Sequence, residues 1–339
     1  MPSLFQRPLF LEPVYKDYIW GGERLVTDFH RRLLPGRYAE SWEIADHPDG
    51  CTRLVGGGGD GQSLSEVLAG HAEELLGAGH AGQMRFPLMV KVIDAKETLS
   101  VQVHPDDTTA PLVGGEAKTE MWIVLAATPD AHIYSGFHPG VTEADFREAL
   151  ARKTIPSLLQ RYPARPGMVF YTPGGRVHAI GAGCLLLEVQ QDANTTYRLY
   201  DWDRLGADGK PRPLHIDKAM QVIHWDDTAS PVAPIQPELP LVPGAVCRQL
   251  LDSPYFHVEE WRLDGEAELS LAGDSFHILF PTDGPIRLKV PGEPAYILSR
   301  ARTCLLPAAC RKFSLRPAAA GAGAAETESR RVLVVREGR

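Results

Sequence analysis

Short runs in which apolar and polar residues alternate dominate this chain. Such a period of two, interrupted by glycine and proline, predicts half-buried β-strands, because successive side chains of a strand point to opposite faces. A mainly β protein, built as a sandwich or a barrel, is expected. We predict strands at residues 99–105, 119–125, 167–173, 184–191, 195–202, 257–263, 276–281, 286–290 and 331–335.

Two segments carry helical periodicity instead. One spans residues 63–77, where Ser63 and Glu66 have the spacing of a capping box and leucines and Val67 form an apolar face. The second begins after Thr142, a favourable N-cap residue. Both indicate small helical additions to a β framework.

Proline and glycine divide the chain. The proline-rich stretch 226–244 is typical of a linker, and residues 318–329 indicate a flexible loop before a last strand at 330–335. We therefore expect two domains, residues 1–228 and residues 245–339.

The overall charge excludes some partners. The formal net charge is -8, with 44% hydrophobic and 23% charged residues, so neither nucleic acid nor an anionic membrane is favoured. Five scattered cysteines without a CxxC pair, and no run long enough to span a membrane, favour a soluble cytoplasmic protein. An anionic ligand would need a local cluster of basic residues.

The strand at 99–104 separates two kinds of side chain. Ser100, Gln102 and His104 lie on one face, and Leu99, Val101 and Val103 lie on the other. Polar groups lined up inside a barrel are costly unless something binds them, and a metal ion would. The alternative is an amphipathic strand whose polar face meets water.

Two further segments supply candidate ligands. Glu120 lies on the same face of its strand as Lys118, although such a pair can also be a surface ion pair. Downstream, the turn at Pro173–Gly175 would direct His178 back across the barrel.

The hairpin formed by residues 184–202 adds two charged candidates. Glu188 shares a face with Gln190, and Arg198 lies on the return strand. An inward Arg198 would need an anion such as phosphate or carboxylate, whereas a rim position would pair it with Asp201 or Asp203.

An amide, two imidazoles and a carboxylate form a hard-to-borderline ligand set. If Gln102, His104, Glu120 and His178 converge, zinc fits the set, and iron(II), manganese or cobalt could also occupy it. We expect one ion per chain, with positions open to water or substrate.

At this point the sequence resembles the type I phosphomannose isomerases, in their short bacterial form. The resemblance lies in PLMVKVIDAKETLSVQVHPDD (87–107), KTEMWIVL (118–125) and PGGRVHAIGAGCLLLEVQQDANTTYRLYDWDR (173–204), and more weakly in WGG (20–22) and ESWEIADHPDG (40–50). It implies a cupin double-stranded β-helix, or jelly-roll barrel, with a helical insertion and a second, degenerate cupin lobe.

The resemblance also implies residue roles. Metal ligands fall on Gln102, His104, Glu120 and His178, and active-site basic residues fall on Lys91, Lys118 and Arg198. The C-terminal block matches only loosely, and its His257 and His277 are isolated. We expect that lobe to be structural.

The implied reaction interconverts mannose 6-phosphate and fructose 6-phosphate through a cis-enediol. Lys118 is the first hypothesis for the proton shuttle and Glu188 is the rival base. Arg198 would hold the phosphate or the developing oxyanion, helped by Ser100 and Lys91.

Two other functions compete with an isomerase that acts on a sugar phosphate as a monomer or homodimer. One is an iron-dependent cupin oxygenase with His104, Glu120 and His178 as its triad. The other is a sugar-phosphate sensor without catalysis.

Overall fold

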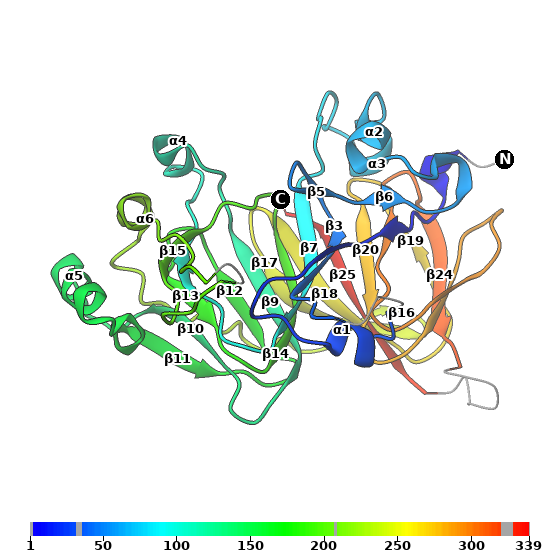
Figure 1. Cartoon of the computed structure of the whole chain (residues 1–339). Helices are drawn as coiled ribbons and strands as arrows, with labels where there is room; N and C mark the ends of the chain where they lie inside the picture. The colour runs from blue at the N-terminus through cyan, green and yellow to red at the C-terminus, as the bar shows by residue number, and fades with distance from the viewer. Residues whose placement is uncertain (1–2, 32–35, 207–208, 320–327, 339) are drawn as a thin grey trace. The chain divides into compact units, whose positions relative to one another are not determined.

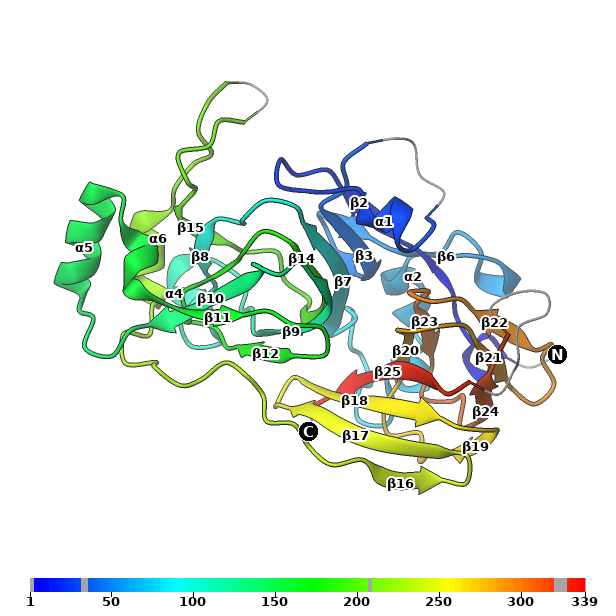
Figure 2. The same ribbon diagram turned by 90° about the horizontal axis from the view of Figure 1, so that it is seen from below.

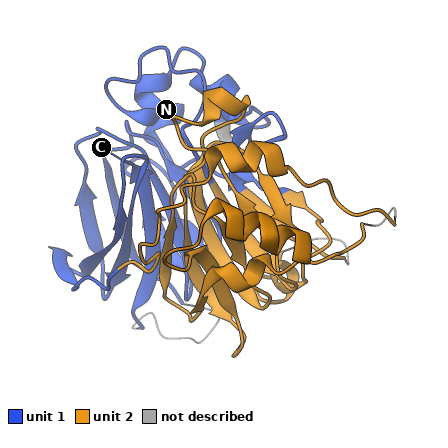
Figure 3. Ribbon diagram, turned by 90° about the vertical axis from the view of Figure 1, so that its left-hand side faces the viewer, with its two compact units in different colours: residues 1–14, 43–89, 234–339 blue, residues 15–42, 90–233 orange. Residues whose placement is uncertain are grey.

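The computed structural model describes residues 3–31, 36–206, 209–319 and 328–338. The chain forms two compact units (Figure 3). Unit 1 contains residues 1–14, 43–89 and 234–339, and unit 2 contains residues 15–42 and 90–233. None of the helices in the described part of the chain is long and apolar enough to cross a membrane.

Unit 2 is built on two antiparallel sheets. A few terminal residues of strands β2, β3 and β7 are assigned to unit 1. The five-stranded sheet runs β11 (Leu159–Pro163), β10 (His132–Phe137), β13 (His178–Ile180), β8 (Val101–Val103) and β15 (Tyr197–Tyr200). The six-stranded sheet runs β12 (Val169–Thr172), β9 (Glu120–Ala127), β14 (Cys184–Gln191), β7 (Leu88–Ala95), β3 (Glu40–Ile44) and β2 (Val14–Lys16).

Helices cover the outer face of the five-stranded sheet, where α5 and α6 lie beside β11, β13 and β15 in Figure 1. Val101 and Val103 of β8 pack there with Phe146 of α5 and Val222 of α6, all buried. The helices of unit 2 are α1 (Arg24–Thr27), α4 (Ala110–Val113), α5 (Glu143–Arg152), α6 (Ile216–Val222) and the 3-10 helix η3 (Ile155–Leu158). The alternation of β8 therefore leaves Gln102 facing the inside of the barrel.

The inward side chains change character along the strands. At one end of the barrel an apolar cluster joins the two sheets, with Ile133 and Ile180 from the first and Val124 and Leu186 from the second. Two residues before Ile180, at the start of β13, the inward side chain is that of His178. The barrel is thus packed at one end and polar at the other, as a binding site requires.

Unit 1 also consists of antiparallel sheets, and Figure 2 shows β16, β17, β18 and β25 side by side. Its six-stranded sheet runs β16 (Leu239–Val242), β17 (Ala245–Asp252), β18 (Phe256–Leu263), β25 (Arg330–Glu337), β20 (His277–Pro281) and β23 (Cys304–Leu306). The four-stranded sheet runs β19 (Ala267–Ser270), β24 (Lys312–Pro317), β21 (Ile286–Lys289) and β22 (Tyr296–Leu298).

N-terminal segments complete unit 1. They form the pairs β1 (Leu11–Glu12) with β6 (Arg53–Leu54) and β4 (Asp46–His47) with β5 (Gly50–Cys51), the helices α2 (Leu64–Leu68) and α3 (Ala72–Leu76), and the 3-10 helices η1 (Leu4–Gln6) and η2 (Gly57–Gly59).

This grouping differs from the division into 1–228 and 245–339 expected from the sequence. Backbone hydrogen bonds explain the difference, because Leu9 and Leu305 exchange two of them, at 2.8 and 2.9 Å, and Ala308 donates to the Leu75 carbonyl at 3.0 Å. Residues far apart in the chain therefore belong to one compact unit.

The helix expected at 63–77 is divided into α2 and α3. The capping box of Ser63 and Glu66 is present as predicted. Gly70, with a φ of +78°, lies in the interruption between the helices, since glycine adopts this left-handed conformation at low cost. In unit 2, Thr142 caps α5 as predicted.

The predicted linker at 226–244 is only partly irregular. Tyr171 and Ala233 donate to the carbonyls of Pro231 and Val169, at 2.8 and 2.9 Å, so residues 231–233 extend the edge at β12. Residues 239–242 form β16. The loop predicted at 318–329 lies mostly outside the described residues, and the strand after it is β25, as predicted.

The turn before β13 holds the strands of the site together. Gly175 has a φ of +85°, and its N–H donates to the His104 carbonyl at 2.7 Å. A Cβ at this position would lie 2.5 Å from the His224 ring, so the turn requires glycine for its backbone conformation and for space.

We predict that Gly175→Ala lowers the free energy of unfolding by more than about 1 kcal/mol. The matched control is Gly167→Ala, because Gly167 also has a φ of +85° but faces open space. Urea unfolding measures both variants. Equal losses would contradict the proposed contact with His224.

Candidate metal centre

Four side chains form a row across the five-stranded sheet. The strand register places Ser135 opposite His178, His178 opposite Gln102, and Gln102 opposite Arg198. Directly opposed residues of neighbouring strands share a face of the sheet. Gln102, His178 and Arg198 therefore point to the same side.

The six-stranded sheet supplies two corresponding rows. Glu120 lies between Thr172 and Gln190, and Trp122 lies between Phe170 and Glu188. The Trp122 and His178 rings meet edge to face with centroids 5.4 Å apart, which shows that these rows face the first sheet across the barrel.

Candidate ligand atoms converge between the sheets. The Nε2 atoms of His104 and His178 and the carboxylate of Glu120 all lie within 4.8 Å of one another. Glu120 Oε1 lies 3.2 Å from His178 Nε2, and Glu120 Oε2 lies 3.6 Å from His104 Nε2. At most 1% of each residue is exposed. The Gln102 amide joins this group, with its Nε2 3.2 Å from His178 Nε2.

Backbone carbonyls set the tautomer of both imidazoles. His104 Nδ1 lies 2.8 Å from the Thr195 carbonyl oxygen, and His178 Nδ1 lies 2.9 Å from that of Arg176. A carbonyl oxygen only accepts, so each Nδ1 carries the hydrogen and each Nε2 presents a lone pair.

These donor atoms fit a divalent cation. His104 Nε2 and both Glu120 oxygens are buried and make no hydrogen bond to a described residue. Lone pairs facing a buried carboxylate repel one another unless a cation lies between them. An amide rotated by 180° would turn Gln102 Oε1 toward such an ion, because its two ends have nearly the same shape.

The charge states also suit a cation. Burial and the nearby Lys118 ammonium lower the pKa of His104 to about 3, and burial lowers that of His178. Burial alone would raise the pKa of Glu120, but the Lys118 ammonium, 3.1 Å away, outweighs it and holds that pKa well below its ordinary value. The centre therefore offers two neutral imidazoles and one carboxylate.

A second charged group lies beside the centre. Lys91 is buried, with its Nζ 3.4 Å from Glu188 Oε1 and 3.8 Å from Glu40 Oε2. Burial alone would lower the pKa of Lys91, but the two carboxylates raise it overall. Trp122 Nε1 donates to Glu188 at 2.8 Å and Trp42 Nε1 donates to Glu40 at 2.6 Å.

The pKa of Glu188 moves the opposite way from that of Glu120. Burial and the charge of Glu120 raise it, against the opposing effects of Lys118 and Lys91. A buried carboxyl whose pKa rises toward neutrality is suited to exchanging protons.

Arg198 lies in a cluster of arginines. Its Nη1 donates to the Pro213 carbonyl at 2.9 Å, and burial followed by the charge of Arg212 lowers its pKa. Arg204 and Arg212 both bind Asp201, each at 2.6 Å. Positive charge therefore exceeds negative charge locally, which favours an anion.

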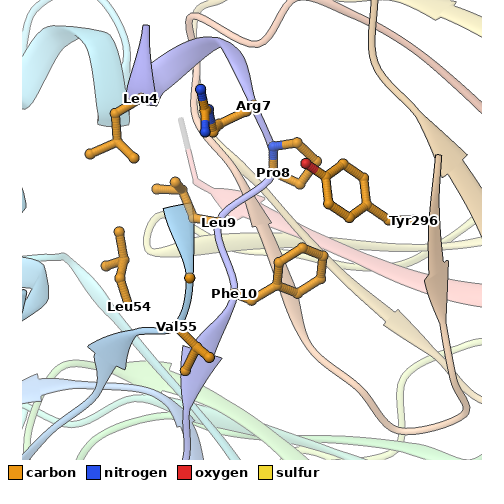
Figure 4. A pocket seen from close by; sticks show the side chains of 9 residues that line it. Leu4, Arg7, Pro8, Leu9, Phe10, Leu54, Val55 and Tyr296 are labelled. Atoms are coloured by element: carbon orange, nitrogen blue, oxygen red, sulfur yellow. The ribbon is translucent and has the colours of Figure 1, made fainter. Parts of the chain in front are cut away.

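A pocket in unit 1 contains none of these groups (Figure 4). Its volume is about 150 Å³, and Leu9, Phe10, Leu54 and other mainly apolar side chains line it. Arg7 at its edge lies 3.6 Å from Glu293. Within the described residues, the cluster with metal-ligand spacing lies in unit 2.

Comparisons with known proteins agree with this geometry. The family model for the phosphomannose isomerase type I catalytic domain matches residues 9–144. Mannose-6-phosphate isomerase ManA of Bacillus subtilis is 38% identical over 315 residues, 91% of this chain and 95% of that protein. This chain belongs to the type I phosphomannose isomerases.

Other relatives specify the branch of the family. The mannose-6-phosphate isomerase of Streptococcus mutans is 36% identical over 88% of this chain and 92% of its own length. The Escherichia coli enzyme matches over only 94 residues, with 32% identity. The predicted resemblance to phosphomannose isomerases is confirmed, and the chain matches the Bacillus and Streptococcus relatives over most of its length.

Solved structures confirm the predicted cupin fold. The crystal structure of the Bacillus subtilis mannose 6-phosphate isomerase superposes with a TM-score of 0.85 and 30% identity, covering 97% of this chain and 99% of that one. A phosphomannose isomerase variant from Salmonella typhimurium has a TM-score of 0.74 at 15% identity, which shows a shared fold.

The geometry decides between several alternatives raised by the sequence. The polar face of the strand around β8 is largely buried, because Ser100 and His104 are buried and Gln102 is half-buried, and the pair of Lys118 and Glu120 is not on the surface. Asp201 binds Arg204 and Arg212, and Asp203 binds Lys153, and among the described residues neither aspartate forms an ion pair with Arg198. Ser100 Oγ donates to Gln102 Oε1 at 3.3 Å.

Sequence reasoning assigned no role to Glu40 and Trp42, although both lie in the quoted block ESWEIADHPDG. The available signal was the weak family resemblance of that block, whereas the full burial of β3 became apparent only in the structure. The sequence could not predict that the Thr195 and Arg176 carbonyls orient the histidines, because every residue has a backbone carbonyl.

We predict that His178→Ala loses the bound divalent ion, because it removes a fully buried nitrogen ligand. Elemental analysis of the purified protein measures this. The control is His132→Ala, whose imidazole lies outside the cluster and beside the Asp130 carbonyl. Full metal content in His178→Ala would contradict the ligand assignment.

Proposed function

We propose that this chain interconverts mannose 6-phosphate and fructose 6-phosphate. The observation that carries the proposal is the buried set of His104, Glu120 and His178 inside the cupin barrel of a type I phosphomannose isomerase. The enediol chemistry of an aldose–ketose isomerase needs two oxygens stabilised and a proton moved between adjacent carbons.

We propose that Gln102, His104, Glu120 and His178 hold one zinc ion. Two imidazoles, a carboxylate and an amide suit zinc, and iron(II), manganese or cobalt are accepted by the same set. When bound, the ion supplies Lewis-acid stabilisation to the oxygens of the sugar.

Arg198 is the candidate for holding the phosphate. It lies directly across β15 and β8 from Gln102 and has a half-buried guanidinium beside Arg212. A planar guanidinium binds phosphate with two parallel hydrogen bonds. The surplus of positive charge here would attract a phosphate against the net charge of -8.

Glu188 is favoured over Lys118 as the base. Its raised pKa suits a group that takes the proton from C2 and returns it at C1, while a second proton passes from O2 to O1. Lys118 lies 3.1 Å from Glu120 and acts by holding that carboxylate ionised. Lys91 lies between Glu40 and Glu188 and therefore holds Glu188 in place instead of contacting phosphate.

The two rival functions gain no specific support. The relatives that match over most of the chain are isomerases, which favours neither an oxygenase nor a sensor. All five cysteines are free thiols, which agrees with the cytoplasm as the compartment.

A coupled assay for fructose 6-phosphate tests the function. We expect turnover of mannose 6-phosphate that a chelator abolishes and zinc restores, without a requirement for oxygen. Zinc-loaded protein that binds the sugar phosphate but gives no turnover would support the sensor instead.

We predict that Arg198→Ala lowers kcat/KM about 10- to 100-fold, because a hydrogen bond to a charged group contributes about 1.5–3 kcal/mol. Metal content should stay unchanged, since Arg198 is not a ligand. Arg161→Ala, on the outer strand β11, is the control. Loss of metal from Arg198→Ala would show that Arg198 supports the centre and not the phosphate.

A further inference from the structure

Gln190 lies beside Glu120 but is neither a candidate metal ligand nor a candidate base. It is fully buried, and the register of β14 and β9 places it directly opposite Glu120 on the same face. Its Nε2 donates to the carbonyls of Gln191 and Ala193, at 2.8 and 2.7 Å. Because carbonyls only accept, these two bonds fix which end of the amide is nitrogen.

The oxygen of the same amide is unused by the fold. Gln190 Oε1 is buried and has no hydrogen-bond partner among the described residues. Thr172 Oγ1, on the other side of Glu120, is in the same condition. A buried acceptor costs free energy unless something donates to it, and an apolar side chain would fill the space without that cost.

The nitrogen end holds the loop that orients His104. Residues 191–195 carry the Thr195 carbonyl, which accepts from His104 Nδ1 at 2.8 Å. Glu116 binds this loop as well. The Glu116 carboxylate accepts a hydrogen bond from Asn194 N at 3.0 Å, and the Glu116 backbone N–H donates one to Thr195 Oγ1 at 3.0 Å. Gln190 and Glu116 therefore both help to hold this loop in place.

We propose that Gln190 is a positioning residue of the metal centre. Its nitrogen fixes the loop that aims His104 Nε2 at the ion. Its Oε1 is a fixed hydrogen-bond acceptor on the same sheet face as Glu120, and it accepts from a hydroxyl group of water or of the sugar. This inference rests on the proposed function only for the identity of the sugar, since the role toward the ion needs no substrate.

The test is Gln190→Met, which keeps the approximate volume and removes both ends of the amide. Zinc affinity is measured in competition with a chromophoric chelator, with no sugar present. We expect the zinc dissociation constant to rise about 10- to 100-fold, as for other groups that orient metal ligands. At saturating zinc, kcat should remain at least tenfold low, with KM for mannose 6-phosphate nearly unchanged.

The matched control is Gln191→Met. Gln191 lies next in the chain, accepts from Thr119 N at 2.8 Å and donates to Asp107 at 3.3 Å, so it contributes similar bonds from the opposite face of the strand. Its zinc affinity should stay close to that of the wild type. An equal loss in both variants would show general loosening of the loop and overturn the proposal.

Other outcomes are equally decisive. Unchanged zinc affinity in Gln190→Met overturns the role toward His104, and full recovery of kcat at saturating zinc overturns the role of Oε1. If Gln190→Met does not fold, Glu116→Ala releases the same loop from its other side and should weaken zinc binding too. A wild type that binds zinc but does not isomerise mannose 6-phosphate would refute the proposed function and leave this test intact.

Discussion

The whole site depends on one electrostatic constraint. Two imidazole lone pairs and a carboxylate face one another in the barrel, at Nε2–O distances of 3.2 and 3.6 Å, with no water-exposed surface to relieve them. A cation makes this arrangement favourable, and without one it is costly. The backbone carbonyls that fix both tautomers, the glycine turn before His178 and the Lys118 ammonium all serve to maintain it.

The same low-dielectric interior shifts the pKa values of two glutamates in opposite directions. Cationic Lys118 keeps Glu120 ionised, as a ligand must be, whereas burial beside Glu120 raises the pKa of Glu188. One negative charge thus favours a proton on the next carboxyl, as expected when like charges are close. In the proposed assignment, ligand and base are therefore the same residue type, on the adjacent strands β9 and β14.

Much of the fold and of the site follows from the sequence, because both rest on alternation along strands. The pattern at 99–104 put Gln102 and His104 on one face, and the turn at Pro173–Gly175 directed His178 toward them. The pattern of a single strand does not show that side chains from two sheets converge. Glu120 was a convincing ligand candidate only together with the family pattern. The backbone partners of the histidines, the interruption at Gly70 and the pairing of Leu9 with Leu305 depend on tertiary contacts, which local pattern does not encode.

Anomalous diffraction from zinc-loaded crystals would locate the bound ion. We predict one peak per chain inside the barrel of unit 2, about 2.0–2.2 Å from His104 Nε2, His178 Nε2 and a Glu120 oxygen. A peak elsewhere, or an empty barrel in fully active protein, would contradict it.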